Sequence, residues 1–350
     1  MDRRDNRIAT TSQRLWALIN QIDQLQGQWI GGAQLNPQAL GRLKRSTLVT
    51  SSGASTRIEG AKLSDEDVAK LMRGLKVTKF ADRDKQGVKG YYELLENVFN
   101  SWKHIPFTES TIKHFHKELL KYGTKDIRHR GEYKKSDNRV EMFDAHGKSL
   151  GVMFETTPAY LTPKQMQELV EWTQVTLKDD ERHALVVIAN FTVEFLAIHP
   201  FQDGNGRLAR ILTNLLMLKS GYAYVPYVSH EKLIEDNKAD YYLALRDSQT
   251  TFKTPRENIN TWLEFFLTVS LKQVRQAIDL LSHENIEKLL SPTQLLVWKH
   301  LERITEATPA EIVKATGVAR PTVSQVLDVL LRLKKIERIG QGRTTRYRKG

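Results

Sequence analysis

The sequence predicts a mainly α-helical protein: a helical bundle with one small β-hairpin, followed by a C-terminal domain of three helices and a second hairpin. Apolar residues recur mostly at steps of three and four, the period of an amphipathic helix, and strand-like alternation is scarce. Residues 183–198 are apolar nearly all round, which is typical of a helix in the middle of a bundle. After residue 284 the pattern changes to short, capped helical segments that end in a basic stretch.

The bundle helices are predicted from this period together with start and stop residues. Ser64 precedes three acidic residues and is expected to cap a helix. Thr162 and Pro163 are expected to begin another helix as its N-cap and first residue, and Ser220 with Gly221 to end a third. The predicted bundle helices are 13–25, 37–48, 64–73, 85–101, 109–120, 164–177, 183–198, 208–219 and 257–282.

A β-hairpin is predicted among these helices, because residues 138–143 and 150–154 alternate around a connection that contains Gly147. We expect three regions along the chain. They are an N-terminal helical region over 1–104, a core over 105–284 and a C-terminal domain over 285–350.

The composition narrows the class of protein. The 53 basic and 41 acidic residues of the 350 leave a formal charge of +12, and residues 287–350 hold 13 Lys and Arg against 6 Asp and Glu, which favours a polyanionic partner. The absence of cysteine excludes disulfides, thiolate metal sites and a cysteine nucleophile. The polar N-terminus is not a signal peptide and no run is apolar enough to span a membrane, so we expect a soluble cytoplasmic protein without a membrane partner.

The segment His199–Arg210, which reads HPFQDGNGRLAR, predicts a phosphate site. Gly204 and Gly206 allow successive backbone N–H groups to point into one concavity, and the helix that follows adds free N–H groups and its positive dipole end. Arg207 and Arg210 share a face in the first turn, where two cations repel each other unless an anion lies between them.

Two more side chains of this segment add chemistry. Asp203 offers a hard oxygen for Mg²⁺, which usually arrives with nucleotide phosphates, and His199 can take a proton from a hydroxyl near neutral pH. Residues 204–209 also fit a dinucleotide-binding pattern, but that pattern follows a β-strand, and here an apolar helix precedes it. A plain glycine helix break explains Gly-Asn-Gly but not the convergence of His, Asp and two Arg residues.

This segment resembles the signature of the Fic-domain family, His-Pro-Phe-x-Asp/Glu-Gly-Asn-Gly-Arg-x-x-Arg, with every fixed position filled. The resemblance extends over roughly residues 105–266. It implies transfer of AMP from ATP to a hydroxyl of a protein side chain, with Mg²⁺ as cofactor and pyrophosphate as the second product. The residues themselves predict phosphate binding beside a base, and the resemblance adds which phosphorus is attacked.

The resemblance also implies a role for each residue of the segment. His199 would deprotonate the hydroxyl, and Asp203 would hold Mg²⁺ on the α- and β-phosphates. The α-phosphate would be held by Asn205 and by the amides from Gly204 to Gly206. The outer phosphates would be bound by Arg207 and Arg210.

The hairpin falls where the family carries its flap, which pairs with the backbone of the target as an added strand. An ordinary surface hairpin is the alternative. The docking residues would be Asn138, Arg139, Val140, Glu141, Met142 and Phe143. Downstream, Tyr241 and Tyr242 resemble the family's segment beside the adenine, although aromatic residues on a helix more often belong to a core.

Far upstream, the segment Ser55-Thr-Arg-Ile-Glu59-Gly60 resembles the inhibitory motif of the family, Ser/Thr-x-x-x-Glu-Gly/Asn, placed N-terminal to the core. Read alone, Ser55 would cap a short helix that has Glu59 near its end. The resemblance implies instead that Glu59 pairs with Arg210 in a bidentate way and takes the place of the γ-phosphate, so that the α-phosphate is misaligned for attack. A second role for Glu59, positioning a water that removes AMP from a modified target, stays open.

The C-terminal region resembles a winged helix-turn-helix domain, with helices expected at 291–304, 308–316 and 320–333 and a hairpin at 336–348. A dimerisation or substrate-docking role is the alternative to DNA binding. The DNA contacts would be Arg320, Thr322, Ser324 and Gln325 in the major groove, and Arg343, Arg346 and Arg348 at phosphates or the minor groove.

Two function classes follow. The leading hypothesis is a self-restrained protein adenylyltransferase that modifies a Ser, Thr or Tyr hydroxyl of a protein, itself included. The rival is a DNA-binding transcriptional regulator whose Fic core senses nucleotide or modifies itself, and transfer of UMP or phosphocholine would use the same loop. A homodimer is the further partner expected, and the sequence names neither the target nor the operator.

Overall fold

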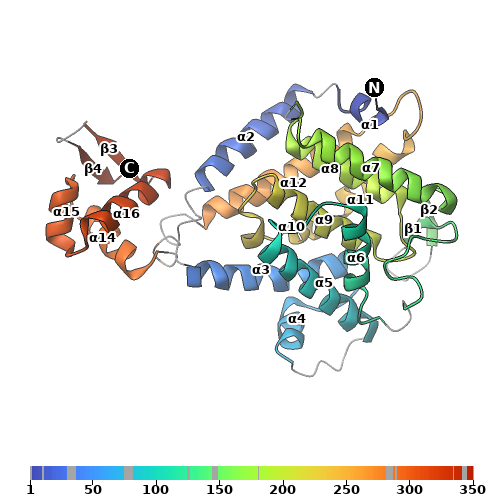
Figure 1. The fold of residues 1–350 in the computed structure, drawn as a ribbon, viewed down its shortest axis with the longest axis horizontal. Coiled ribbons are helices and arrows are strands. Elements are labelled where there is room, and N and C mark those ends of the chain that lie inside the picture. The colour runs from blue at the N-terminus through green and yellow to red at the C-terminus, as the bar shows by residue number, and fades with distance from the viewer. Residues whose placement is uncertain are drawn as a thin grey trace.

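The structure, a computed structural model, describes residues 2–9, 12–29, 37–74, 82–123, 127–143, 149–179, 181–280, 287, 290–333, 335–340 and 345–349. Helices dominate, and the strands form two small antiparallel hairpins, which confirms the predicted fold class. Figure 1 shows a large helical part with the β1–β2 hairpin at one end, while the last three helices and the second hairpin stand apart from it.

The large part contains these elements: α1 (Arg3–Asn6), α2 (Gln13–Trp29), α3 (Pro37–Ile58), α4 (Asp65–Met72), α5 (Asp82–Ser101), α6 (Glu109–Leu119), β1 (Arg139–Phe143), β2 (Ser149–Glu155), η2 (Ala159–Leu161), α7 (Thr162–Thr176), α8 (Ala184–Ile198), α9 (Asn205–Lys219), η3 (Val225–Tyr227), α10 (His230–Asp236), α11 (Lys238–Thr250) and α12 (Asn260–Asp279). Each helix predicted from periodicity is present. Helices α1, α10 and α11 were not predicted from periodicity; α1 and α10 have only four and seven residues, which are too few for a periodic signal.

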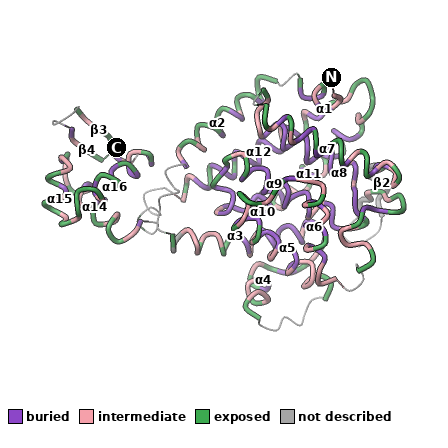
Figure 2. The backbone as a smooth tube through the Cα atoms, viewed as in Figure 1, coloured by how far each residue is buried: buried purple, intermediate pink, exposed green. Residues whose placement is uncertain are grey.

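The core is centred on α8 and α9. All but two residues of α8 are buried, as its apolar surface predicts, and it packs against α7, α9 and α12. Figure 2 shows the buried chain concentrated in these central helices. The ends of α8 and α9 that face each other are therefore held rigidly, and the short connection between them inherits that rigidity.

Helix α3 is longer than predicted and ends at Ile58 rather than near residue 48. Its second half is rich in Ser and Thr, which usually compete with helix formation. Here they bond back along the helix: the hydroxyls of Ser52 and Thr56 donate to the carbonyls four residues earlier, at 2.7 and 2.8 Å. Since this half packs against α5 and α10, burial stabilises a helix that propensity alone does not favour.

Two smaller expectations about helix ends were wrong. Thr162 is the first residue of α7 rather than its N-cap, and its hydroxyl donates to Pro158 O at 3.1 Å. Helix α9 begins at Asn205, three residues earlier than predicted, so the glycine-containing segment is already its first turn. Ser64 does cap α4, with a reciprocal bond from Asp67, and Ser220 ends α9.

The β1–β2 hairpin pairs Arg139 with Glu155 and Val140 with Phe154, and its register shifts twice further along. The strands agree with the prediction. The side chains of Glu141, Met142 and Phe143, which were predicted to dock the target, lie outside the described residues.

The C-terminal part consists of α14 (Pro292–Glu302), α15 (Pro309–Thr316), α16 (Arg320–Arg332), β3 (Ile336–Ile339) and β4 (Arg346–Lys349). Two capping boxes, Ser291 with Gln294 and Thr308 with Glu311, begin the first two helices. Among the described residues, no helix is both long and apolar enough to cross a membrane.

Candidate active site

The phosphate loop (residues 199–206) comprises the connection from α8 to α9 and the first two residues of α9, and two unusual backbone conformations set its shape. His199, the C-cap of α8, lies in the left-handed region at φ 51° and ψ 60°, and Gly204, the N-cap of α9, has φ 79°. A non-glycine residue in this region costs on the order of 1–3 kcal/mol and persists only where its surroundings enforce it. The surroundings here are the buried ends of two core helices.

Two buried side chains shape the loop. The amide of Asn205 accepts from the Phe201 N–H at 2.9 Å and donates to the Phe201 carbonyl at 2.7 Å. Both polar atoms of the Asn205 side chain are therefore engaged in holding the loop. Of the donors expected to bind phosphate, Asn205 can supply its backbone N–H but not its side chain. The N–H groups of the first turn of α9 have no acceptor within the helix, which leaves them available to an anion.

His116 of α6 is the second shaping residue, and sequence reasoning missed it. Its Nδ1 accepts from the Gly131 N–H at 2.8 Å, so its Nε2–H donates to the Asp203 carbonyl at 3.0 Å. Its ring stacks on Phe201 with 3.8 Å between centroids, and burial lowers its pKa to about 4. The side chain is thus neutral and has one tautomer.

His199, the predicted base, is also neutral. Burial lowers its pKa to about 4, and its Nδ1 lies 3.3 Å from the Leu196 carbonyl. Donation from Nδ1 leaves Nε2 as the proton acceptor. A phosphate anion nearby would raise this pKa towards neutrality, because an opposite charge favours the imidazolium.

Arg210 is held by the end of α3. Its side chain is 3% exposed, its Nε donates to the Ser55 hydroxyl at 2.9 Å, and its Nη2 donates to the Ser55 carbonyl at 2.9 Å and to Glu59 Oε1 at 2.7 Å. Burial alone would lower the pKa of Arg210, but the Glu59 carboxylate beside it raises that pKa above its usual value. The structure therefore brings together the three residues that the sequence placed in the inhibitory contact.

The expected bidentate geometry is wrong. Only one carboxylate oxygen of Glu59 meets Arg210: Oε1 accepts from Nη2, Ser55 accepts from Nε and Nη2, and Nη1 has no hydrogen-bond partner among the described residues. Ser55 lies within the last turn of α3 and does not cap a helix. Glu59 itself is 39% exposed, which identifies it as the outer member of the contact.

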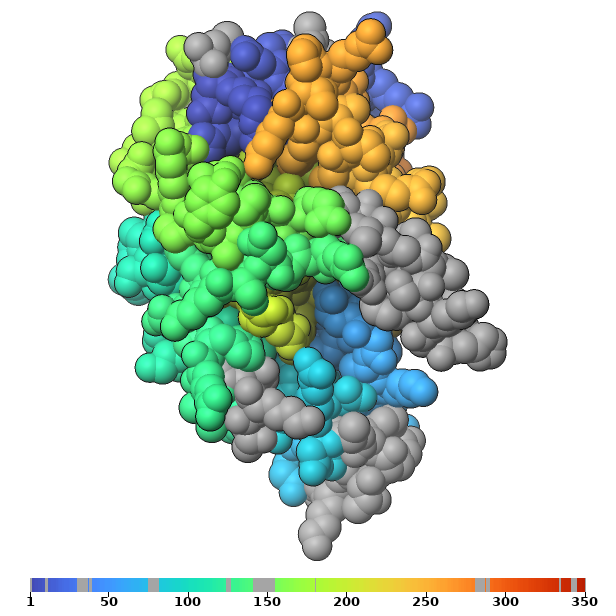
Figure 3. All heavy atoms as spheres, turned by 90° about the vertical axis from the view of Figure 1, so that its right-hand side faces the viewer, coloured from blue at the N-terminus to red at the C-terminus, as the bar shows by residue number. Residues whose placement is uncertain are grey.

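The Glu59 carboxylate also lies against the start of α9. A Cβ built on Gly206 would be 2.3 Å from Glu59 Oε1 and 3.4 Å from Arg210 Nη1. Only glycine permits this approach. The carboxylate thus lies where a helix N-terminus and an arginine together attract an anion. In Figure 3 the yellow chain of this region lies in a hollow beside the blue chain of α3.

Asp203, the predicted metal ligand, is engaged by arginines. Its Oδ2 accepts from Arg83 at 3.0 Å and its Oδ1 from Arg207 at 3.3 Å and from the Gly204 N–H at 2.6 Å. Burial alone would raise the pKa of Asp203. Arg207, the Gly204 N–H and Arg83 outweigh that effect, so the pKa lies below its usual value and the carboxylate stays ionised. No group of three or more His, Asp or Glu side chains that could hold a metal occurs among the described residues. A single ionised carboxylate fits a Mg²⁺ that arrives with phosphates and keeps water ligands.

Lys134 joins the hairpin to the phosphate loop, and it too was missed. Its Nζ donates to Asn138 Oδ1, Thr156 Oγ1 and the Ile198 carbonyl at 2.8, 2.9 and 3.0 Å, and its N–H donates to the Pro200 carbonyl. Burial lowers its pKa to about 8. Of the predicted docking residues, Asn138 is thereby fixed, and it also donates to the Phe201 carbonyl at 3.0 Å.

The two tyrosines expected beside the adenine differ. Tyr241 is 3% exposed and packs in the core, with its ring 5.8 Å from Trp262 and 5.7 Å from Phe265. Tyr242 is half-buried, and its hydroxyl donates to the carbonyl of Ile58, the last residue of α3, at 3.3 Å. Both tyrosines therefore border the site: the Tyr241 hydroxyl interacts with Arg210, and Tyr242 contacts the end of α3.

The predicted DNA contacts fall into two sets. Arg320, Ser324 and Gln325 are exposed and Thr322 is half-buried on the first turns of α16. In the hairpin, Arg348 pairs with Glu337 at 2.7 Å, Arg346 lies 3.4 Å from Glu306, and Arg343 lies outside the described residues. Carboxylates thus already neutralise the two described hairpin arginines.

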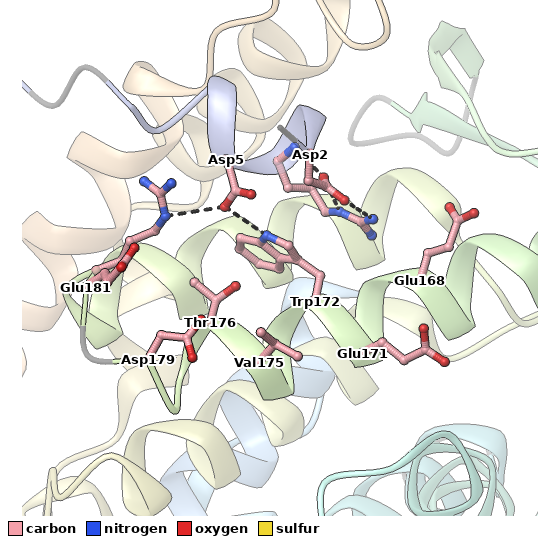
Figure 4. Close-up of a pocket in the computed structure, with 11 residues that line it drawn as sticks. Asp2, Asp5, Glu168, Glu171, Trp172, Val175, Thr176, Asp179 and Glu181 are labelled. Atoms are coloured by element: carbon pink, nitrogen blue, oxygen red, sulfur yellow. Dashed lines mark hydrogen bonds and ion pairs between the residues drawn. The ribbon is translucent and has the colours of Figure 1, made fainter.

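A cavity of about 380 Å³ lies between α1 and α7 and shares no residue with the phosphate loop. Figure 4 shows carboxylates around it. Its inner carboxylates are already paired: Asp5 accepts from Trp172 at 3.1 Å and lies 3.3 Å from Arg182, and Asp2 pairs with Arg4 at 2.8 Å. The cavity offers no base beside a phosphate site, so we place the chemistry at the phosphate loop.

The site thus combines a neutral histidine, a helix N-terminus, two arginines and a carboxylate in a helical domain, an arrangement that suits a phosphate group beside a proton acceptor. Residues 106–217 match the Fic/DOC family.

Relatives with known names agree. The chain is 24% identical over 213 residues to a probable protein adenylyltransferase of Aquifex aeolicus, an alignment that covers 60% of this chain and 59% of that protein. It is 34% identical over 100 residues to the protein adenylyltransferase fic-1 of Caenorhabditis elegans, which covers 27% of this chain and 17% of that one. The matched segments therefore span less than two thirds of these relatives.

Solved structures share the fold. A Fic family protein from Desulfovibrio desulfuricans superposes with a TM-score of 0.63 at 25% identity, over 97% of both chains. Fic-1 from Caenorhabditis elegans superposes with a TM-score of 0.58 at 21% identity, over 76% of this chain and 71% of that one. The first likeness includes the C-terminal part as well as the Fic domain.

Proposed function

We propose that this protein is an adenylyltransferase that moves AMP from ATP to a hydroxyl of a protein side chain. The observation that carries the proposal is the neutral His199 beside the N-terminus of α9, with Arg210 in the same first turns. The names of the matched relatives support the reaction class.

The proposed reaction uses the residues in one step. His199 Nε2 takes the proton of the target hydroxyl, the hydroxyl oxygen bonds to the α-phosphorus of ATP, and the bond from that phosphorus to the bridging oxygen breaks. Pyrophosphate leaves with the electron pair. The first-turn N–H groups of α9 stabilise the charge that develops on the α-phosphate, and Arg207 and Arg210 bind the outer phosphates. Mg²⁺ held by Asp203 would neutralise phosphate charge.

We further propose that the resting protein is restrained. The carboxylate of Glu59 lies between Gly206 and Arg210, the position where an outer phosphate would bind. As long as it stays there, the γ-phosphate cannot reach Arg210, and the α-phosphate is displaced from the line of attack. A displacement of about 1 Å can cost about a hundredfold in rate.

The reaction is tested with two labels. We expect ATP labelled at the α-phosphorus, but not ATP labelled at the γ-phosphorus, to mark protein when added to cell lysate with Glu59→Gly protein. The His199→Ala change on the same background should abolish labelling, since it removes the base. Labelling from the γ-phosphorus would identify a kinase instead, and labelling that survives His199→Ala would refute the assigned base.

DNA binding is a second candidate function, favoured by the exposed polar residues on the first turns of α16. It predicts a mobility shift of duplex DNA that weakens steeply with salt and survives His199→Ala. Absence of any mobility shift at low salt would contradict DNA binding.

A further inference from the structure

A second cavity lies close to the proposed base. It has a volume of about 320 Å³ and is bounded by the end of β2, the last turn of α8 and the connection from α11 to α12. Glu155, the last residue of β2, and Ala197, two residues before His199, both line it. The cavity therefore lies at the end of α8 that leads to the base, and beside the hairpin that is expected to hold the target.

One buried side chain of this cavity has no hydrogen-bond partner among the described residues. Gln249 is 8% exposed, and in the described part of the chain neither its amide oxygen nor its amide nitrogen is hydrogen-bonded. Other polar side chains of the wall are satisfied: Thr157 donates to Gln165 at 2.6 Å, and Glu194 pairs with Arg7 at 2.7 Å. Buried amides are nearly always bonded, so an unbonded one at a cavity wall indicates a ligand that supplies the bonds.

The rest of the wall suits a short apolar stem. Phe252 lines the cavity beside Ala197, and its ring is held by the guanidinium of Arg7, 4.7 Å from the ring centroid. Next to it Lys253 adopts φ 60°, a left-handed conformation that side chains other than glycine rarely take. Such strained residues gather at ligand clamps, which is an independent sign of a site.

We propose that this cavity is a subsite for a carboxamide side chain, Asn or Gln, located near the modified hydroxyl in the target polypeptide. That the ligand belongs to a target protein rests on the proposed function. The Gln249 amide offers one acceptor and a donor group, and a second carboxamide, which carries an acceptor and a donor side by side in one plane, can pair with both at once. Its methylene stem would contact Phe252 and Ala197.

The hydrogen-bonding groups of Gln249 argue against ionised side chains. A carboxylate would use only the donor of Gln249 and would face Glu155 and Glu194 as well as Lys253. An ammonium group would use only the acceptor, although the two glutamates would attract it. A neutral amide leaves no amide atom of Gln249 unbonded.

The first test measures binding without catalysis. Saturation-transfer NMR would compare N-acetyl-glutamine methylamide with N-acetyl-leucine methylamide on the wild-type protein, on Gln249→Leu, and on Gln167→Leu, which removes an exposed glutamine of α7. We expect a signal for the glutamine probe on the wild type and on Gln167→Leu, and its loss on Gln249→Leu. Equal signals on all three proteins, or none on the wild type, would overturn the subsite.

The second test measures selectivity. Glu59→Gly protein would be given serine-containing peptides that carry Gln, Glu, Leu or Lys at each position flanking the acceptor. We expect about a tenfold preference for Gln at one position, the size of one lost hydrogen-bonded group, and its loss with Gln249→Leu. Gln249→Glu keeps the shape and should shift the preference to Lys. Labelling without preference would overturn the subsite, whereas labelling of no peptide would count against the proposed function and leave the NMR result to decide the subsite.

Discussion

At the scale of single residues, the site is defined by side chains whose charge state is set by burial. His199 and His116 are both neutral because burial lowers their pKa to about 4, while Asp203 stays ionised beside arginines. A base and an anion thus lie within the phosphate loop, and a neutral histidine of α6 supports it. His199 therefore stays unprotonated, and able to act as a base, at acidic pH values at which an ordinary histidine is already protonated.

The first prediction follows from His199. An exposed histidine with a pKa near 6.5 would be only about 3% neutral at pH 5, so its activity there would fall about thirtyfold. With a pKa of about 4 in the free enzyme, His199 stays mostly neutral at pH 5. We therefore expect kcat/KM of Glu59→Gly protein to change less than twofold between pH 7.5 and 5. An acid limb with a midpoint near 6.5 in the rate profile would show that His199 is not desolvated.

At the scale of elements, three segments that are distant in sequence meet at the phosphate loop. The end of α3 holds Arg210, α6 supports the loop through His116, and Lys134 ties the hairpin to the end of α8. The geometry of the phosphate loop therefore depends on how α3, α6 and the segment around Lys134 pack against it.

The second prediction concerns Lys134. Lys134→Met keeps the length of the side chain but removes three hydrogen bonds that join Asn138, Thr156 and the Ile198 carbonyl. We expect AMP transfer to a protein target to fall at least about tenfold, the effect of one to two lost buried bonds, with the larger change in the KM for the target. Lys135→Met, at the exposed neighbouring residue, is the control. Equal activities of the two variants would show that AMP transfer does not depend on the hydrogen bonds of Lys134 to the hairpin.

The sequence predicted the elements and the local loop, but not how neighbouring segments pack against that loop. The order of residues from His199 to Arg210 predicts a phosphate site because their chemistry is local to one turn. The contact of Glu59 with Arg210 was predicted through family resemblance, and its one-oxygen geometry was not, because it depends on how far α3 continues. His116 and Lys134 carry no pattern of their own, since each acts through contacts made by tertiary packing.

At the scale of the whole molecule, three buried histidines link stability to pH. His116, His199 and His230 each have a pKa lowered by burial to about 4. Above pH 6.5 they are neutral in both the folded and the unfolded chain. Between 6.5 and 4 the unfolded chain binds the protons, so folding stability is lost as the pH falls through this window.

The third prediction is the size of that loss. Each histidine contributes up to about 1.4 kcal/mol per pH unit within the window, so three contribute up to about 4 kcal/mol per unit. We expect Tm, followed by circular dichroism, to fall steeply from pH 6.5 to 5. His230→Leu should reduce the slope by about a third, while His104→Leu, at an exposed histidine, should not. A Tm independent of pH over this range would contradict the buried, neutral state of the three residues.

The central claim is that the phosphate loop is competent and that Glu59 restrains it. The direct test is labelling with α-labelled ATP by three proteins: wild type, Glu59→Gly, and Glu66→Gly, whose glutamate is exposed on α4. We predict labelling by Glu59→Gly at least about tenfold above wild type, with Glu66→Gly equal to wild type, because only the first frees Arg210 for the outer phosphate. Equal labelling by wild type and Glu59→Gly would contradict the claim.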